Sequence, residues 1–114
     1  MAEQRTYVTQ ESCPVARTLD VVGERWTILL LRDLSRGRKR YSDLMQSLNG
    51  ISTNLLAERL KRLEDAGMVE QVLYSEHPPR AEYRLTTKGK AFVPVLKALK
   101  AYGDEWEPRR TVES

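Results

Sequence analysis

The clearest hydrophobic pattern in the chain lies between residues 49 and 67, in the stretch NGISTNLLAERLKRLEDAG. Leu56, Leu60 and Leu63 recur at the spacing that lines one side of an α-helix. Gly67 follows at a position where helices commonly stop. The pattern predicts a helix whose leucine side is buried in a core.

The opposite side of this predicted helix carries small and polar groups at its start and positive charge towards its end. A hydroxyl at the start can cap the helix by accepting an N–H of the first turn, and two adjacent residues offer one. Such a face is either a solvated surface or a binding surface. It comprises Ser52, Thr53, Asn54, Ala57, Glu58, Lys61 and Arg62.

Three shorter helical patterns precede it. The first runs from Pro14, a residue typical of a first helical position, to about residue 22. The second, GERWTILLLRDLSRG (23–37), is apolar around most of its circumference, which predicts a buried central helix with Trp26 in the core. The third is YSDLMQSLNG (41–50), a helix of about two turns.

The third helix and the leucine helix together predict a helix-turn-helix over residues 41–66. Gly50 can adopt the positive φ that such a turn needs, and Ile51 is placed to fill the angle between the helices. Alternating apolar and polar residues then predict a β-hairpin over 68–85, with HPPR at its turn. The predicted fold class is therefore mainly α with a small antiparallel β-hairpin, a winged helix-turn-helix with N- and C-terminal dimerisation helices.

A last helix is predicted over residues 87–106, with Pro94 kinking it because the proline ring removes a backbone hydrogen bond. Its apolar stripe is about five turns long, which is more than one small domain usually covers. The alternative to dimerisation is that this helix folds back on the 23–37 helix. We expect a homodimer that uses this helix and the first one, through Val15, Leu19, Leu96, Leu99, Tyr102 and Trp106.

Length and composition allow one small domain. The 114 residues, 40% of them apolar, suffice for a modest core, and we place the domain at 13–106 between a flexible arm (1–12) and a tail (107–114). The longest apolar run, WTILLL, is too short to cross a membrane, and the first ten residues lack the apolar segment of a secretory signal. A cytoplasmic protein without membrane association is expected.

The residues for catalysis or metal binding are scarce. One cysteine and one histidine exclude an internal disulfide framework and a Cys/His metal site. No nucleophile with a base, no paired carboxylates and no Gly-rich phosphate loop marks an enzyme. We predict no metal, no cofactor and no enzymatic activity, and we expect His77 at the turn of the hairpin.

The net charge of +3 lies in the middle of the chain, where residues 36–90 hold eleven basic and seven acidic side chains. A dense basic segment and the hairpin carry much of this excess, in Arg36, Arg38, Lys39, Arg40 and Arg80. Alone, such a segment is either a solvated loop or a contact for a polyanion. Beside a helix-turn-helix it predicts double-stranded DNA as the partner, with the polar face of the leucine helix in the major groove.

Two alternatives to this function stay open. Some winged helices are protein–protein adaptors without direct DNA binding, which a neutral recognition helix with an apolar patch would indicate. The regulator could also be a MarR-like repressor that responds to a small ligand, for which the sequence shows no pocket.

Three segments resemble successive blocks of the HxlR family of bacterial winged helix-turn-helix regulators: CPVARTLDVVGERWTILLLRDL, GISTNLLAERLKRLEDAGMV and PPRAEYRLTTKGKAFVPVL. The resemblance covers about residues 13–103. It implies a dimeric DNA-binding transcriptional regulator, here expected to be a repressor on a near-palindromic operator, usually near its own gene and a divergent neighbour. Tyr41, Gln71 and Tyr102 depart from the family, which generally has Phe, often Arg and commonly Trp there.

Cys13 is predicted at the start of the first helix, where the positive end of the helix dipole favours a thiolate, with Arg17 one turn further on. Several HxlR-type proteins sense electrophiles or oxidants with a cysteine in this Cys-Pro position. The resemblance therefore implies that Cys13 is redox-sensing and has a small electrophile or oxidant as its partner. The alternative is a small buried apolar residue.

Overall fold

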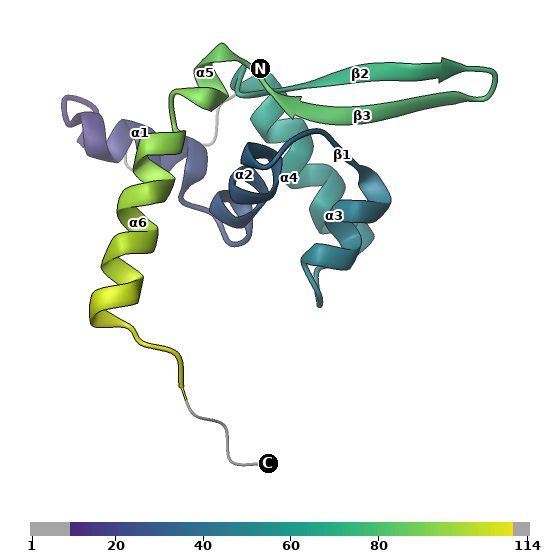
Figure 1. Cartoon of the computed structure of the whole chain (residues 1–114). Coiled ribbons are helices and arrows are strands. Elements are labelled where there is room, and N and C mark those ends of the chain that lie inside the picture. Colours follow the sequence, from purple (N-terminus) through teal and green to yellow (C-terminus); the bar gives the residue numbers. More distant parts are fainter. Residues whose placement is uncertain (1–9, 111–114) are drawn as a thin grey trace.

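The computed structural model describes residues 10–110, apart from the side chains of residues 76 and 79. Residues 1–9 of the predicted arm (1–12) and residues 111–114 of the predicted tail (107–114) therefore lie outside the described residues. Figure 1 shows the helices and strands in chain order: α1 (Pro14–Val22), α2 (Thr27–Ser35), β1 (Lys39–Arg40), α3 (Tyr41–Ser47), α4 (Thr53–Asp65), β2 (Val69–Glu76), β3 (Pro79–Leu85), α5 (Thr87–Lys90) and α6 (Val93–Trp106).

The core lies where α2, α3 and α4 meet. Burying a leucine side chain contributes about 1.5–3 kcal/mol each, so this cluster is a main source of the domain's stability. The leucine side of α4 is buried as the spacing predicted. The most deeply buried side chains are Leu30, Leu31, Leu44, Leu48, Leu56, Leu60 and Leu63, and Met68, Val69, Leu85 and Phe92 extend the cluster to the base of the hairpin.

The turn between α3 and α4 has the geometry that the sequence predicted. Gly50 has a φ of +101°, in the left-handed region that a residue with a side chain rarely adopts. Ile51 is buried between the helices. Ser52, rather than its neighbour, caps α4, because its hydroxyl accepts the Leu55 N–H at 3.1 Å. The helix-turn-helix is thus fixed by one glycine, one apolar plug and one cap.

The sheet has three strands in the order β1-β3-β2, all antiparallel. The short strand β1 pairs Lys39 with Tyr83 and Arg40 with Glu82. The basic segment is therefore not a loop throughout, because these two residues form a strand. The edge of β3 offers unpaired backbone groups, and a two-residue strand that satisfies them leaves no periodic signal in the sequence.

The helix predicted from residue 23 begins only at Thr27, so that boundary was wrong. Trp26 has a φ of 77°, a left-handed conformation that interrupts a helix and is uncommon for a bulky residue. Its ring packs partly against the core and lies close to Gly50. Leu29, expected in the core, is 39% exposed.

The prediction of one kinked helix over 87–106 was also wrong. Two helices stand there, because α5 ends at Lys90 and Pro94 lies in the first turn of α6, where the missing N–H costs nothing. Gly89 lets α5 approach the backbone closely, since a Cβ there would lie 2.1 Å from the Met68 carbonyl oxygen. Figure 1 shows α6 pointing away from the hairpin, and none of its residues is buried.

Candidate nucleic-acid interface

The outer face of α4 presents an exposed polar surface. Asn54, Ala57 and Glu58 are exposed on its first two turns, together with Thr53, while the leucines of the same helix point into the core. Ser52 is also exposed, and its hydroxyl is engaged in the cap. The face therefore combines amide, hydroxyl, carboxylate and methyl groups within a few ångströms along one helix, which suits contacts to base edges and phosphates.

Lys61 continues this face one turn later and is held by an acidic neighbour. Its Nζ lies 2.7 Å from Asp65 Oδ1. The hydrogen bond to Asp65 and the charge of that carboxylate raise the pKa of Lys61 above its ordinary value of 10.5. The ammonium is charged at any physiological pH, but Asp65 competes with any phosphate for it.

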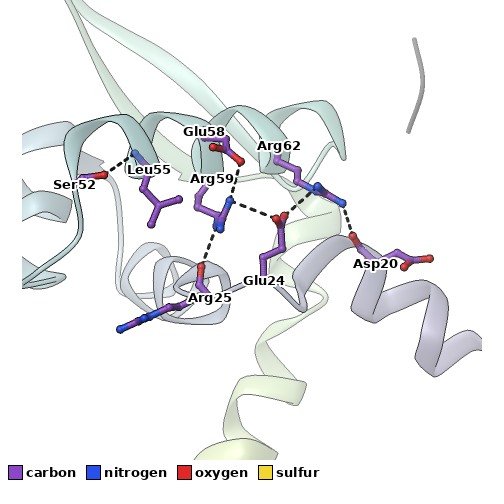
Figure 2. Close-up of polar contacts among 8 residues, drawn as sticks. All are labelled: Asp20, Glu24, Arg25, Ser52, Leu55, Glu58, Arg59 and Arg62. Carbon is purple, nitrogen blue, oxygen red and sulfur yellow. Dashed lines mark hydrogen bonds and ion pairs between the residues drawn. The ribbon is translucent and has the colours of Figure 1, made fainter. Parts of the chain in front are cut away.

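Arg62, predicted on the same face, points towards α1 in the structure. Its side chain is 28% exposed, and Nη2 donates to the Asp20 carbonyl oxygen at 2.8 Å while Nη1 lies 3.1 Å from Glu24 Oε1. Arg59, which the sequence analysis did not single out, lies beside it and is 11% exposed. Figure 2 shows both guanidinium groups directed at the turn before α2. Arg59 directly precedes the buried Leu60, and this position was the signal in the sequence that its side chain could lie partly buried.

The basic segment runs from the end of α2 into the edge strand β1. Arg36 and Arg38 are exposed, and Arg36 Nη1 lies 4.0 Å from Asp33. Arg40 stacks over the ring of Tyr74, with its Cζ 4.8 Å from the ring centroid. This contact ties the basic segment to the hairpin, so both present their charge from one sheet.

A hollow of about 340 Å³ opens between the end of α2, β1 and α3. Its lining is charged or polar throughout, with two carboxylates and two cationic groups among Asp33, Arg36, Lys39, Asp43, Gln46 and Ser47. Small-molecule sites are usually lined by apolar and aromatic groups with few polar ones. This hollow therefore gives little support to a MarR-like ligand pocket.

The basic side chains of the hairpin differ in whether an acidic neighbour pairs with them. Arg80 is exposed next to the turn, as is His77 in the turn itself. Arg84 is neutralised by Glu70, whose Oε2 lies 2.7 Å from its Nε. Of the wing residues considered, Arg80 is the one left to meet a polyanion.

Tyr41 links the two helices of the helix-turn-helix. Its hydroxyl donates a 2.5 Å hydrogen bond to the Thr53 carbonyl oxygen in the first turn of α4. A phenylalanine at this position could not make this bond. Burial, and then the charge of Glu64, raises the pKa of the nearby Tyr83 phenol, so it stays protonated.

Cys13 is the N-cap residue of α1 and is partly buried. Its side chain makes no capping hydrogen bond. Arg17, the cation expected to assist the thiolate, instead donates from Nη1 to the Glu11 carbonyl oxygen at 2.6 Å. Of the two features predicted to activate the thiol, the position at a helix N-terminus is present, whereas the Arg17 guanidinium is directed to the Glu11 carbonyl oxygen.

The predicted dimerisation residues are mostly exposed apolar groups. Figure 1 shows α1 and α6 on the side of the domain away from the hairpin turn. Leu96 packs partly against the core of its own chain. We call the exposed large apolar residues of α1, α2 and α6 together the apolar surface, which comprises Val15, Leu19, Leu29, Val95, Leu99, Tyr102 and Trp106.

Other kinds of site find little support in residues 10–110. No helix among them is both long and apolar enough to span a membrane. Within the same residues no group of three or more histidine, cysteine, aspartate or glutamate side chains is arranged to hold a metal ion.

The fold and the polar face of α4 define a winged helix-turn-helix protein. Residues 21–111 match the HxlR-like helix-turn-helix family, and the chain belongs to that family. An HTH-type transcriptional regulator of Synechocystis is 37% identical over 107 residues, which cover 94% of this chain and 79% of the relative. The relatives are transcriptional regulators and not enzymes, so this chain is a transcriptional regulator of the helix-turn-helix type.

Solved structures agree with this assignment. A Porphyromonas gingivalis protein assigned to the MarR family of transcriptional regulators has a TM-score of 0.79 and 33% identity, covering 84% of this chain and 94% of its own. The redox regulator HypR in its oxidized form has a TM-score of 0.78 and 33% identity, covering 88% of this chain and all of its own. The predicted fold class and family are confirmed.

The Lys61–Asp65 pair generates the first testable prediction. In Asp65→Asn, Lys61 loses its competing carboxylate, so we expect tighter binding to DNA of any sequence, by several-fold at low salt. Asp104→Asn is a matched control, because Lys100 and Asp104 form an ion pair of the same spacing and the same 2.7 Å length on α6. Fluorescence anisotropy with a labelled duplex measures both. Equal effects of the two substitutions would contradict a role for Lys61 at the interface.

Proposed function

We propose that the chain acts as a homodimeric, sequence-specific DNA-binding repressor on a near-palindromic operator. The observation that carries the proposal is the division of α4 into a buried leucine side and an exposed polar side. A helix that is held by its apolar side and presents amide, hydroxyl and ammonium groups on the other fits the major groove of B-DNA.

The groups on α4 have distinct expected roles. Asn54 can bond both edge groups of an adenine, and Ala57 can contact a thymine methyl group. Glu58 can accept from a cytosine amino group, and Lys61 can donate to guanine or to phosphate. Ser52 and Thr53 lie at the N-terminus of α4, where backbone N–H groups and hydroxyls favour a phosphate.

Phosphate contacts outside α4 would come from the basic segment and the hairpin. These contacts carry little sequence information but supply affinity that depends on salt. The residues assigned to this role are Arg36, Arg38, Lys39, Arg40 and Arg80. Arg62, whose guanidinium is engaged with α1 and the following turn, would contact DNA only if it left that position.

The homodimer is supported by the apolar surface. Val15 is 67% exposed, and Tyr102 and Trp106 are each 63% exposed. Exposed apolar surfaces of this kind usually contact a partner. A two-fold dimer would place its two α4 helices on successive turns of one DNA face, about 34 Å apart or a small multiple of that distance.

A protein–protein adaptor without DNA contact is less favoured. Its recognition helix would offer an apolar patch, whereas the large exposed apolar groups among residues 10–110 lie on α1, α2, α6 and the hairpin, and none of them lies on α4. A repressor role is the simplest one, because an operator-bound dimer can block transcription by occupying the DNA.

A second part of the proposal is that Cys13 switches DNA binding in response to an oxidant or electrophile. Its place at the start of α1, beside the apolar surface, and the likeness of the chain to the redox regulator HypR support this role. With one cysteine per chain, oxidation would end in a disulfide with Cys13 of the partner subunit, a mixed disulfide with a small thiol, or a sulfenic acid. Any of these would change the packing of α1.

DNA binding itself is tested with the DNA upstream of the protein's own gene. We expect a footprint there, with affinity falling steeply with salt, at a log–log slope of about −0.9 per phosphate neutralised. Asn54→Ala should change the preferred sequence, at a cost of about 1–3 kcal/mol in discrimination. Arg38→Ala should weaken all sequences alike and reduce the slope by about one. Lys97→Ala, on α6, is the charge-matched control, and binding that is absent or insensitive to salt would contradict the proposal.

The dimer is tested by a pair of lysine substitutions on α6. Leu99→Lys places a charge within the apolar surface and should yield monomers, because a buried unpaired charge opposes association. Ala101→Lys introduces the same group about 200° round the helix and should leave the dimer intact. Multi-angle light scattering distinguishes the two, and a dimeric Leu99→Lys variant would rule out this surface as the interface.

The Cys13 switch is tested by comparing the wild type with Cys13→Ser before and after treatment with diamide or a quinone. We expect operator affinity to change on treatment in the wild type and to stay constant in the variant, because the chain has no other thiol. Mass spectrometry under non-reducing conditions identifies the product. An operator affinity indifferent to oxidant in both proteins would return Cys13 to a packing role.

A further inference from the structure

The turn that joins α1 to α2 is tied to the middle of α4 by two arginines and one glutamate. Figure 2 shows Arg59 and Arg62 reaching from α4 to opposite sides of the Glu24 carboxylate. Arg59 Nη1 lies 3.4 Å from Glu24 Oε2, and Arg62 Nη1 lies 3.1 Å from Glu24 Oε1. We call these three residues the Glu24 clamp.

Each arginine also holds a backbone carbonyl next to the carboxylate. Arg59 Nε donates to the Arg25 carbonyl oxygen at 3.0 Å, and Arg62 Nη2 donates to the Asp20 carbonyl oxygen at 2.8 Å. Asp20 belongs to α1, and Arg25 lies in the turn after it. The clamp therefore grips the last turn of α1 and the start of the next segment together.

These contacts are partly shielded from solvent, although 33% of the Glu24 side chain is exposed. The Arg59 side chain is 11% exposed, and Glu24 Oε1 is shielded from solvent. Among the described residues Oε1 accepts no aligned hydrogen bond, so its contact with Arg62 is an ion pair and not a well-aligned hydrogen bond. A shielded carboxylate oxygen that lost this cation would be left with an uncompensated charge.

The gripped turn is also under backbone strain. Trp26, two residues after Glu24, has the left-handed φ of 77° that a bulky side chain rarely adopts. Such a conformation persists only where its surroundings hold it. The bond from Arg59 to the Arg25 carbonyl oxygen acts on the residue directly before it.

The clamp and the leucine core constrain α4 in different ways. Apolar contacts are non-directional, so the leucines fix which side of α4 is buried more firmly than they fix the tilt of the helix or its slide along its axis. Guanidinium contacts are directional and set positions along and around the helix. The Glu24 clamp therefore constrains the angle between α4 and α1.

We propose that Glu24, Arg59 and Arg62 are positioning residues that set the spacing between operator half-sites which the dimer accepts. The proposal rests on the proposed function, in which α1 contributes to the dimer and α4 reads DNA. If α1 is fixed to the partner and α4 is fixed to α1, the two α4 helices of the dimer have one allowed separation. Loosening the clamp lets each α4 tilt and widens the range of spacings that can be bound.

The test measures the Kd of the full-length protein for its footprinted operator and for duplexes with one base pair added to or removed from the centre. One base pair changes the relative rotation of the half-sites by roughly 35°, so the wild type should discriminate strongly against both. Glu24→Gln keeps the shape of the side chain and removes its charge. We expect it to reduce the discrimination ratio by about tenfold, which corresponds to ~1.4 kcal/mol.

Glu70→Gln is the matched control, since it adds the same charge and breaks a 2.7 Å ion pair with Arg84 on the wing. It should alter overall affinity at most and leave the spacing ratio unchanged. The ratio of the Kd values for the altered and the original duplexes separates positioning from stability, because a merely structural role would weaken binding to all three duplexes by the same factor. That result, or an unchanged ratio in Glu24→Gln, would overturn the proposal.

A second variant guards against a folding defect. Arg62→Lys keeps the positive charge but cannot reach Glu24 and the Asp20 carbonyl oxygen as a fork, so it should relax the spacing in the same direction. Circular dichroism confirms that each variant is folded. A wild type that binds no duplex specifically would contradict the proposed function, whereas wild-type discrimination that both variants retain would overturn the positioning role alone.

Discussion

Packing of the leucine side of α4 against α2 and α3 is the contact on which the rest of the structure depends. A helix of 13 residues is marginal by itself in water, so α4 exists because Leu56, Leu60 and Leu63 are buried. The same burial decides which residues stay outside. The polar face is exposed because it lies on the side of α4 opposite the buried leucines.

Polar contacts then fix what the apolar core leaves adjustable. Tyr41 bonds the first turn of α4, Ser52 caps it, and the Glu24 clamp holds its middle. Each of these contacts joins α4 to a different neighbour or terminus. The orientation of the recognition helix is thus set at several points along its length by groups that contribute modestly to stability.

The sequence predicted the elements whose side chains repeat with a period. The boundaries of α1, the leucine side of α4, the plug at Ile51 and the hairpin all follow from such patterns, and so does the exposure of Asn54 and Lys61. Each of these depends on local spacing. They were predictable because neighbours along one helix or strand determine them.

Features that depend on contacts distant in sequence were not predictable. The strand β1 depends on an edge of β3, more than forty residues later. The inward turn of Arg62 depends on Glu24 and Asp20, which no spacing connects to α4. The left-handed Trp26 looks like an ordinary helical residue in an apolar run, and the close approach of Gly89 to the Met68 backbone joins two segments that no spacing connects.

The absence of buried residues on α6 has a consequence for how such a regulator responds to its own abundance. On α6, Leu99, Tyr102 and Trp106 stay exposed within their own subunit, so we expect the DNA-reading form to be made by association. On the proposed homodimer, the amount of that form rises as the square of the chain concentration while monomers predominate. Operator occupancy then rises more steeply with protein concentration than it would for a regulator that binds DNA as a monomer. The rates of synthesis and degradation of the chain therefore also control how much of the operator is bound.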